Sequence, residues 1–412
     1  MDAQVTDTPE PPRFAGWDER PATGPGPDRP GPPRGPSHRR RWRHWAALGV
    51  VGVMLAGAGA GWAVYAKLDS NIRTDSATEK ELRKWESERP PAGPPNAANV
   101  LLIGSDSRHG DNRRYGRDDG QRSDTTMLLH LAADRKSATA VSIPRDLMVD
   151  VPHCKHPDGT ETPPRTTQFN GAFAVGGVAC MIRTVEKLTG IRIDHYLIID
   201  FVGFTKMVDA VDGVEVCLPR PIHDPAAQLT LPAGRQTLHG EAALGYVRAR
   251  KSLGNGSDTQ RMQRQQEFLG ALVKKVQSNG VLLNPARLYP VLDAATSSLI
   301  TDTALASLKG LYELVRSTRS IPTGRVQFMT VPRREYRYDP NRDELVQPDA
   351  GRLFAQLHND LPVTVKPPPD TGEKPVRAGG ATAAGRARGA PSPSPSPTPS
   401  FPRATAEHGL CE

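Results

Sequence analysis

Residues 99–108, NVLLIGSDSR, decide the fold of this 412-residue chain. The first six form an apolar run, typical of a β-strand that is buried on both faces. The polar residues Ser105 and Asp106 follow directly at its carboxyl end. Because ligands of open α/β sheets bind where the strands end, Asp106 is a candidate site residue.

Two more strands are predicted at residues 126–131 and 138–143. Asp124 stands just before the first of them, and Arg145 follows the second in a Pro-Arg-Asp turn. Asp106, Asp124 and Arg145 therefore all lie at strand ends or starts, where polar groups from different strands can meet. The interval 109–121, rich in Asp, Arg and Gly, is predicted to be an exposed loop.

Strand and helix patterns alternate from residue 98 to residue 365. Such alternation predicts the α/β class, with an α/β/α sandwich around a mixed central β-sheet. Further strands are expected at 194–199, 214–218 and 326–331, and helices at 170–188, 201–211, 238–242, 263–276, 305–315 and 353–357.

Residues 246–266, YVRARKSLGNGSDTQRMQRQQ, concentrate basic side chains. Arg248 and Arg250 are two apart, which in a strand would point both to one face. The planar guanidinium fork stays charged and suits phosphate or pyrophosphate. A solvated basic face is the alternative, but the apolar flanks favour a site. After a Gly/Ser turn, helical spacing adds Asp258, Arg261, Arg264 and Gln265 to the group expected to converge on one anion.

The N-terminal part predicts a membrane anchor. Residues 1–44 read as a disordered basic cytoplasmic tail whose last seven residues include four arginines. Residues 45–66 carry no charge and would extend roughly 33 Å as a helix, enough to cross a bilayer. The arginines favour a cytoplasmic N-terminus and an extracytoplasmic remainder. A cleaved signal peptide, processed near 56–61, is the alternative. Residues 67–97 are expected to be a linker with a short helix at 75–88.

The low hydrophobic content and the many Pro and Gly residues indicate unstructured ends rather than a poorly packed core. Hydrophobic residues make up 37%, with Pro 40 and Gly 38, and residues 366–412 read as a Pro/Ser-rich disordered tail. The net charge of +8 is weak evidence for nucleic acid. No zinc-ligand spacing, recognition-helix pattern or RNA-binding motif accompanies it, so no nucleic-acid partner is expected. The abundance of Arg, Ala, Gly and Pro resembles actinobacterial proteins of high GC content.

The four cysteines fit an oxidising compartment. A bridge between Cys154 and Cys180 is predicted, because it would fix residues 155–179 against the sheet. Cys217 would then be left with Cys411, although four cysteines allow three pairings.

Five blocks of the sequence resemble the LytR-CpsA-Psr family of cell-envelope enzymes: NVLLIGSDSR, RSDTTMLL, VSIPRDLMV, NGAFAVGG and residues 246–266. The resemblance covers about residues 98–360. It implies a magnesium-dependent phosphotransferase that moves an anionic glycopolymer from an undecaprenyl or decaprenyl pyrophosphate carrier to the N-acetylmuramic acid hydroxyl of peptidoglycan. Pyrophosphatase activity and a long apolar cavity for the lipid are further expectations of the resemblance.

The same resemblance implies roles for particular residues. Asp106 and Asp124 match the aspartates associated with Mg²⁺, and Asp258 matches an acidic residue of the site. The interval between the first two is longer here than is usual in the family. Asp106 and Asp258 are both candidates for the base that takes the acceptor proton, and Arg145 is a catalytic candidate. The residues expected to hold the pyrophosphate are Arg122, Arg145, Arg248, Arg250, Arg261 and Gln265.

Two alternative functions are a non-enzymatic envelope protein that binds lipid-linked polymer, and a transcriptional attenuator or regulator. The second needs the arginines in the cytoplasm, whereas the charge asymmetry of the anchor places them outside.

Overall fold

The structure is a computed structural model, and it divides into two compact units, Met1–Ala60 and Gly61–Glu412. Each unit is described by itself. The residues that the structure describes are 38–106, 110–115, 123–156, 158–249, 258–278, 285–363, 365–366, 401–402 and 404–405.

The N-terminal helix α1 (His38–Asn71) contains the predicted membrane span. Within it, the candidate span Trp42–Asn71 contains an 18-residue window with a mean hydropathy of 1.8 and no buried residue. Trp45 and Trp62 are 73% and 71% exposed. Among the described residues, this helix alone is long and apolar enough to cross a membrane.

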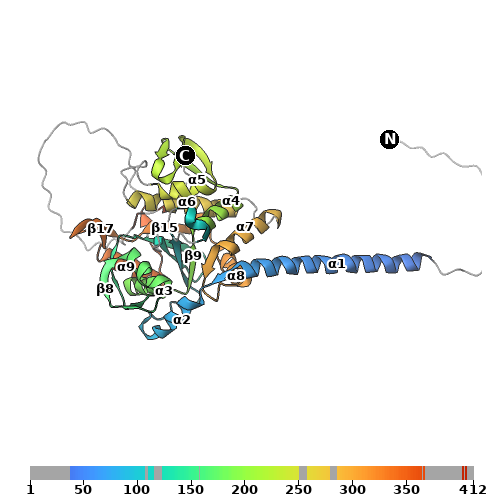
Figure 1. The fold of residues 1–412 in the computed structure, drawn as a ribbon, viewed down its shortest axis with the longest axis horizontal. Helices are drawn as coiled ribbons and strands as arrows, with labels where there is room; N and C mark the ends of the chain where they lie inside the picture. The colour runs from blue at the N-terminus through green and yellow to red at the C-terminus, as the bar shows by residue number, and fades with distance from the viewer. Residues whose placement is uncertain are drawn as a thin grey trace, which may run out of the picture. The chain divides into compact units, whose positions relative to one another are not determined.

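An eight-stranded mixed sheet forms the centre of the second unit (Figure 1). Three neighbouring pairs run parallel, β1 with β14, β2 with β9 and β4 with β15, and the others run antiparallel. The strands in spatial order are β1 (Arg73–Thr74), β14 (Leu299–Thr301), β9 (His195–Ile199), β2 (Ala98–Ser105), β3 (Ser123–Leu131), β4 (Ala138–Ile143), β15 (Val326–Thr330) and β20 (Ala404–Thr405).

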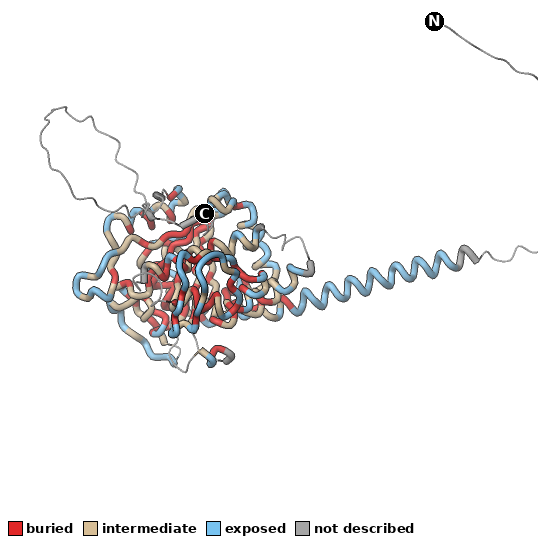
Figure 2. The backbone as a smooth tube through the Cα atoms, turned by 90° about the horizontal axis from the view of Figure 1, so that it is seen from above, coloured by how far each residue is buried: buried red, intermediate tan, exposed pale blue. Residues whose placement is uncertain are grey.

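Helices cover both faces of this sheet, so the predicted α/β/α sandwich is confirmed (Figure 1). Alternate residues of a strand point to opposite faces. Leu128 accordingly packs in one apolar cluster with Phe169 and Leu353, whereas its neighbour Met127 packs in another with Leu269. Figure 2 shows the buried backbone gathered in the middle of the unit. The first face carries α2 (Ser76–Lys84), α3 (Phe169–Thr189) and α9 (Asp349–His358), and the second α4 (Phe201–Ala210), α5 (Gly240–Arg248) and α6 (Asp258–Ser278).

Smaller elements surround the sandwich. They are the strand pairs β5 (Met148–Val151) with β8 (Arg165–Gln168), β6 (Cys154–Lys155) with β7 (Glu161–Thr162), β10 (Val214–Leu218) with β13 (Gly234–Leu238), β11 (Ile222–Asp224) with β12 (Leu229–Leu231), β16 (Arg333–Tyr336) with β17 (Asp339–Leu345), and β18 (Val365–Lys366) with β19 (Phe401–Pro402), together with the helices α7 (Pro285–Ser298) and α8 (Leu308–Thr318).

The predicted strand around Arg248 is wrong. Helix α5 continues through Arg248, because Ala243, Leu244 and Tyr246 are all buried at helical spacing. Arg250 lies outside the described residues. The helix α7 was not predicted, since Pro290 stands inside it and interrupts the pattern.

Residues 67–97, predicted as a linker, are part of the folded domain. Strand β1 pairs with β14, and α2, whose position was predicted, packs on α3. The guanidinium of Arg89 holds the buried carboxylate of Glu186 in α3, with Nη2 to Oε1 at 2.6 Å and Nε to Oε2 at 3.0 Å. Arg89 therefore fastens this stretch to the domain.

The predicted disulfide Cys154–Cys180 is present, and its Cα atoms are 5.5 Å apart. Helix α3 kinks beside it at Gly176 and Gly177. A Cβ atom on Gly176 would lie 2.7 Å from Cys180 Cβ, so only glycine fits there. Cys217 is also disulfide-bonded. Its pairing with Cys411 stays a prediction, since Cys411 lies outside the described residues.

The C-terminal region predicted as a disordered tail contains three short strands. In the central sheet β20 runs antiparallel to β15, with Ala404 opposite Phe328. The other residues of 367–412, apart from 401–402, lie outside the described part of the chain.

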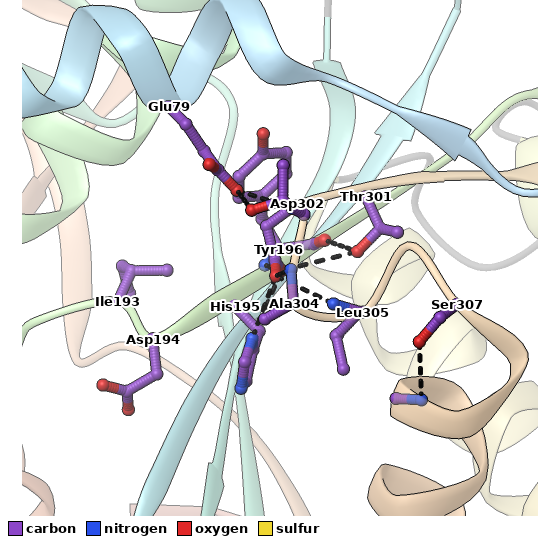
Figure 3. A network of polar contacts seen from close by, with 12 residues as sticks. Glu79, Ile193, Asp194, His195, Tyr196, Thr301, Asp302, Ala304, Leu305 and Ser307 are labelled. Carbon is purple, nitrogen blue, oxygen red and sulfur yellow. Dashed lines mark hydrogen bonds and ion pairs between the residues drawn. The ribbon is translucent and has the colours of Figure 1, made fainter.

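A polar network fastens α2 and the loop after β14 to the sheet (Figure 3). Asp302 accepts hydrogen bonds from the backbone N–H of Ala304 and Leu305, at 3.0 and 3.1 Å, and its Oδ1 lies 3.2 Å from His195 Nδ1. Glu79 of α2 accepts from the backbone N–H of Thr303 at 2.5 Å. The hydrogen bond to Asp302 raises the pKa of His195, although burial opposes the shift.

This network predicts a change in stability as the pH rises above about 6.5. A histidine with a raised folded-state pKa stabilises the fold fully below its unfolded pKa of about 6.5, and the contribution is lost as the pH rises through the folded-state value. We expect the Tm of the wild type to fall across that window, and His195→Gln to have a lower Tm at pH 6 and a flatter profile. The two melting curves should converge at high pH. A constant difference in Tm from pH 6 to pH 9 would contradict the assignment.

Candidate functional site

A cavity of about 300 Å³ lies between the sheet and helices α4, α5 and α6. Its walls are mainly apolar, with a small number of charged and amide groups, as is usual for ligand sites. The lining residues are Leu102, Ile103, Gly104, Ser105, Asp124, Thr125, Met127, Ile199, Asp200, Phe201, Phe204, Leu244, Val247, Arg248, Arg261, Gln265, Phe268 and Leu269.

Asp106 and Asp124 lie at the same end of two hydrogen-bonded strands. Ser105 in β2 pairs with Ser123 in β3, and a bulge shifts the register between Gly104 and Ser105. Consecutive residues of a regular strand face opposite ways, and a bulge re-aims them. Both Asp124 and Thr125 therefore line the cavity. Asp106, one residue beyond Ser105, is half-buried at the same edge.

Arg145 reaches Asp124 from the turn after β4, as predicted. Its Nη1 lies 3.1 Å from Asp124 Oδ1, and its Nε lies 3.2 Å from Asp146 Oδ2. The backbone carbonyl of Arg145 accepts from Asn170 N–H at 3.0 Å, which fixes the turn to the start of α3. A cation is thus held beside the aspartate that lines the cavity.

Arg248, Arg261 and Gln265 line the cavity from α5 and α6. Arg248 is the last residue of α5, where a cation suits the negative end of the helix dipole. Its guanidinium carbon lies 4.5 Å from the Phe201 ring centre, and Gln265 Nε2 donates to the Val247 carbonyl at 3.1 Å. These three predicted anion-binding side chains therefore share one cavity.

Arg264 does not join them, contrary to the expected convergence. It is buried, and its Nη2 donates to the Ala249 carbonyl just past the end of α5. Burial lowers the pKa of this guanidinium. Arg264 thus joins α6 to the end of α5. Arg122 and Arg250 lie outside the described residues, and so does the side chain of Asp258, which begins α6.

The interval predicted as an exposed loop contributes a short 3₁₀ helix, η2 (Gly110–Tyr115), beside the cavity. The predicted exposure holds for Arg113 and Arg114 but not for Asn112, which is only 4% exposed. Its amide donates to Asp200 Oδ2 at 2.8 Å and accepts from Val202 N–H at 3.1 Å. Tyr115 packs edge-on to Phe201, with ring centres 5.2 Å apart. The contacts of Asn112 and Tyr115 in η2 therefore fix the turn that starts α4.

Residues 64–357 match the model of the LytR_cpsA_psr family. The chain belongs to the LytR-CpsA-Psr family. A solved structure with the same fold is that of a LytR-Csp2A-Psr enzyme from Actinomyces oris. It is 22% identical, has a TM-score of 0.51, and the match covers 66% of this chain and 93% of that one.

Curated LytR-CpsA-Psr relatives include two proteins of Corynebacterium glutamicum, named "Probable cell wall biosynthesis protein LcpB" and "Cell wall biosynthesis protein LcpA". The first is 45% identical over 48% of this chain and 47% of its own length, and the second 35% over 57% and 50%. The chain thus spans about half the length of these two relatives. The "polyisoprenyl-teichoic acid--peptidoglycan teichoic acid transferase TagT" of Bacillus subtilis is 26% identical over 79% of this chain and 97% of its own.

The LytR-CpsA-Psr site offers the ligands that Mg²⁺ prefers. Mg²⁺ is usually held by one or two carboxylates together with substrate phosphates. Asp106 and Asp124, at one end of β2 and β3, fit that pattern. Among the described residues no three His, Cys, Asp or Glu side chains form a metal-binding group.

The apolar wall residues were not predicted individually. Two of the helices that the sequence predicted, at 201–211 and 263–276, correspond to α4 and α6 and line the cavity. Helix α5 contributes Leu244 and Val247 to the lining. This was not predicted, because a strand was expected around Arg248. A Leu or Phe at helical spacing looks the same in sequence whether it faces a core or a cavity, so no sequence signal separates the two.

Proposed function

We propose that this protein is a phosphotransferase that moves a glycopolymer from a polyprenyl pyrophosphate carrier to the N-acetylmuramic acid hydroxyl of peptidoglycan. The observation that carries the proposal is one cavity with apolar walls and with Asp124, Arg248, Arg261 and Gln265 on its lining. An isoprenyl chain fits the apolar part, and a diphosphate fits the cationic and amide groups.

Family membership and the names of relatives support the same reaction. TagT is named for the transfer of teichoic acid to peptidoglycan, and LcpA for cell wall biosynthesis. The helix α1 supports attachment to the cell membrane. We propose a single-pass anchor with a cytoplasmic N-terminus and an extracytoplasmic domain, because four arginines precede the apolar stretch.

The proposed reaction exchanges the phosphoanhydride bond of the carrier for a phosphate ester bond to the acceptor. The acceptor oxygen attacks the phosphorus that carries the polymer, the bond to the bridging oxygen breaks, and the polyprenyl phosphate leaves. The acceptor proton goes to a base, for which Asp106 remains a candidate beside Asp258. Arg145, Arg248 and Arg261 supply fixed positive charge for the oxygens that become more negative.

Bound Mg²⁺ would offset further charge on the phosphate oxygens. Asp106 and Asp124 would hold it. The fixed contact between Arg145 and Asp124 would keep that carboxylate aimed at the cavity while the ion and the diphosphate enter.

A transfer assay tests this proposal. The full chain in detergent is incubated with a lipid-linked saccharide, Mg²⁺ and peptidoglycan oligomers, and mass spectrometry follows the oligomers. We expect saccharide attached through a phosphodiester and release of polyprenyl phosphate. Binding of the lipid-linked saccharide with no covalent product would instead indicate a protein that retains polymer, and the proposal would fall.

The apolar wall predicts that affinity depends on the length of the lipid. Each buried CH₂ contributes about 0.8 kcal/mol, so burying only two of the five carbons of an added isoprenyl unit already strengthens binding about tenfold. We expect the Kd to fall in this way from geranyl to farnesyl to geranylgeranyl pyrophosphate, until the cavity is filled. Calorimetry measures the series, with inorganic pyrophosphate as the control that lacks a tail. Equal affinities throughout would show that the cavity holds no lipid.

A further inference from the structure

A line of alternating charges leads from the cavity to the β16–β17 hairpin. Arg145 contacts Asp124 at 3.1 Å and Asp146 at 3.2 Å, through different nitrogens of one guanidinium. Arg342 Nη1 of the hairpin lies 3.9 Å from Asp146 Oδ1. Side chains from β3, the turn after β4 and the hairpin therefore form one chain of alternating charge, which Arg342 continues to Asp339, whose Oδ2 lies 3.8 Å from its Nε.

Backbone contacts fasten the hairpin to the same turn. The N–H of Asp343 donates to the carbonyl of Asp146 at 3.1 Å. Leu147 and Asp343 form a parallel β-bridge. The carboxylate of Asp343 is buried and paired with Arg333. The distance between Arg342 and Asp146 is thus set by the backbone on both sides and not by two freely moving side chains.

Arg342 is also held from the side of β8. The carboxamide of Gln168 accepts from its guanidinium when the amide oxygen faces it, with Nη1 at 3.2 Å. The side chain of Arg342 is 30% exposed, and those of Arg145 and Asp146 are 21% and 20% exposed. Partly buried charges of this kind interact more strongly than pairs in open water.

We propose that Asp146 and Arg342 are positioning residues for the transfer reaction, which hold the guanidinium plane of Arg145 against Asp124. The inference rests on the proposed function. Neither side chain lines the cavity, so both act through Arg145. Asp146 fixes one edge of the planar guanidinium while Asp124 holds another. Arg342 offsets the charge of Asp146, and without it this chain of charges would be more negative near the bound diphosphate.

Variants of the hairpin test the proposal. Arg342→Ala should lower kcat about tenfold, as losses of supporting contacts around a site commonly do, and leave the KM for peptidoglycan oligomers within twofold. Arg342→Lys should recover part of the rate. The matched control is Arg334→Ala, which removes a 2.7 Å ion pair with Glu344 across the same hairpin from a side chain that is 67% exposed. It should keep kcat within twofold, and all three variants should keep the wild-type Tm within a few degrees.

A double-mutant cycle decides whether Arg342 acts through Arg145. In an Arg145→Ala background, Arg342→Ala should cause no further loss of kcat, because the group that it positions is gone. Losses that multiply, or an Arg342→Ala rate equal to that of the Arg334→Ala control, would overturn the proposal.

The two proposals fail in different ways. A wild type that transfers nothing would refute the proposed function. The cycle would then be read from the Kd for farnesyl pyrophosphate in calorimetry, where the same absence of an added effect is expected. Independent effects of the two substitutions on that Kd would refute the positioning role by itself.

Discussion

Replacing Arg145 by alanine should lower kcat for transfer by roughly 100- to 1000-fold, the usual cost of removing one donor aimed at developing charge. The side chain is held 3.1 Å from Asp124, which lines the cavity, so its charge is already in place before the reaction. Steady-state transfer kinetics with saturating lipid-linked saccharide measure the effect.

The fold should survive this substitution. Arg145 is 21% exposed, and the Asn170 N–H bond to its carbonyl involves only the backbone, which alanine keeps. Arg145→Lys retains the charge but not the fork that meets two carboxylates, so it should recover only part of the rate. Arg145→Ala that works within a few-fold of wild type, with an unchanged Tm, would remove this residue from the mechanism.

Replacing Glu186 by alanine should destabilise the domain by about 3–5 kcal/mol, since it removes the buried carboxylate of the pair and leaves Arg89 with the more exposed Glu86 at 3.5 Å and the Ile193 carbonyl at 2.9 Å. The two side chains are 2% and 11% exposed, and Arg89 is joined to Glu186 by both Nε and Nη2. Chemical denaturation followed by circular dichroism measures the loss of unfolding free energy.

Two further variants make the Glu186 result specific. Glu344→Ala removes an ion pair whose arginine is 67% exposed, and should cost less than about 1 kcal/mol. The double substitution Arg89→Met with Glu186→Leu should recover most of the stability, because an apolar pair replaces two buried charges. A Glu186→Ala loss no larger than that of Glu344→Ala would mean that residues 86–90 are the loose linker that the composition suggests.

The sheet could be predicted from sequence because its strands are strongly apolar. Residues 99–104 and 138–143 fall within β2 and β4, and Val214–Leu218 coincides with β10. Sequence periodicity does not predict the element where the same residues fit both a strand and a helix. Arg248 looked like a strand residue beside Arg250, yet the buried Leu244 and Tyr246 extend α5 to include it. The apolar side chains buried on one face of α5 decide the element here, and the two-residue spacing of Arg248 and Arg250 does not.

The candidate site could be predicted in its charged part only. Strand ends bring Asp124 and Arg145 together, as the sheet topology implies. The bulge that aims both Asp124 and Thr125 at the cavity has no marker in the sequence. The sequence does not distinguish Arg264 from Arg261, because both are arginines at helical spacing. Arg264 donates a hydrogen bond to the Ala249 carbonyl just past the end of α5, and that contact depends on the length of α5, which was not predicted.

A structure of the full chain with a bound polyprenyl pyrophosphate tests the central claim most directly. The account predicts the diphosphate within hydrogen-bonding distance, about 2.7–3.2 Å, of Arg248 and Arg261, with the first isoprenyl units against Phe204 and Phe268. A diphosphate bound at another surface, or a lipid tail that leaves the cavity empty, would contradict it.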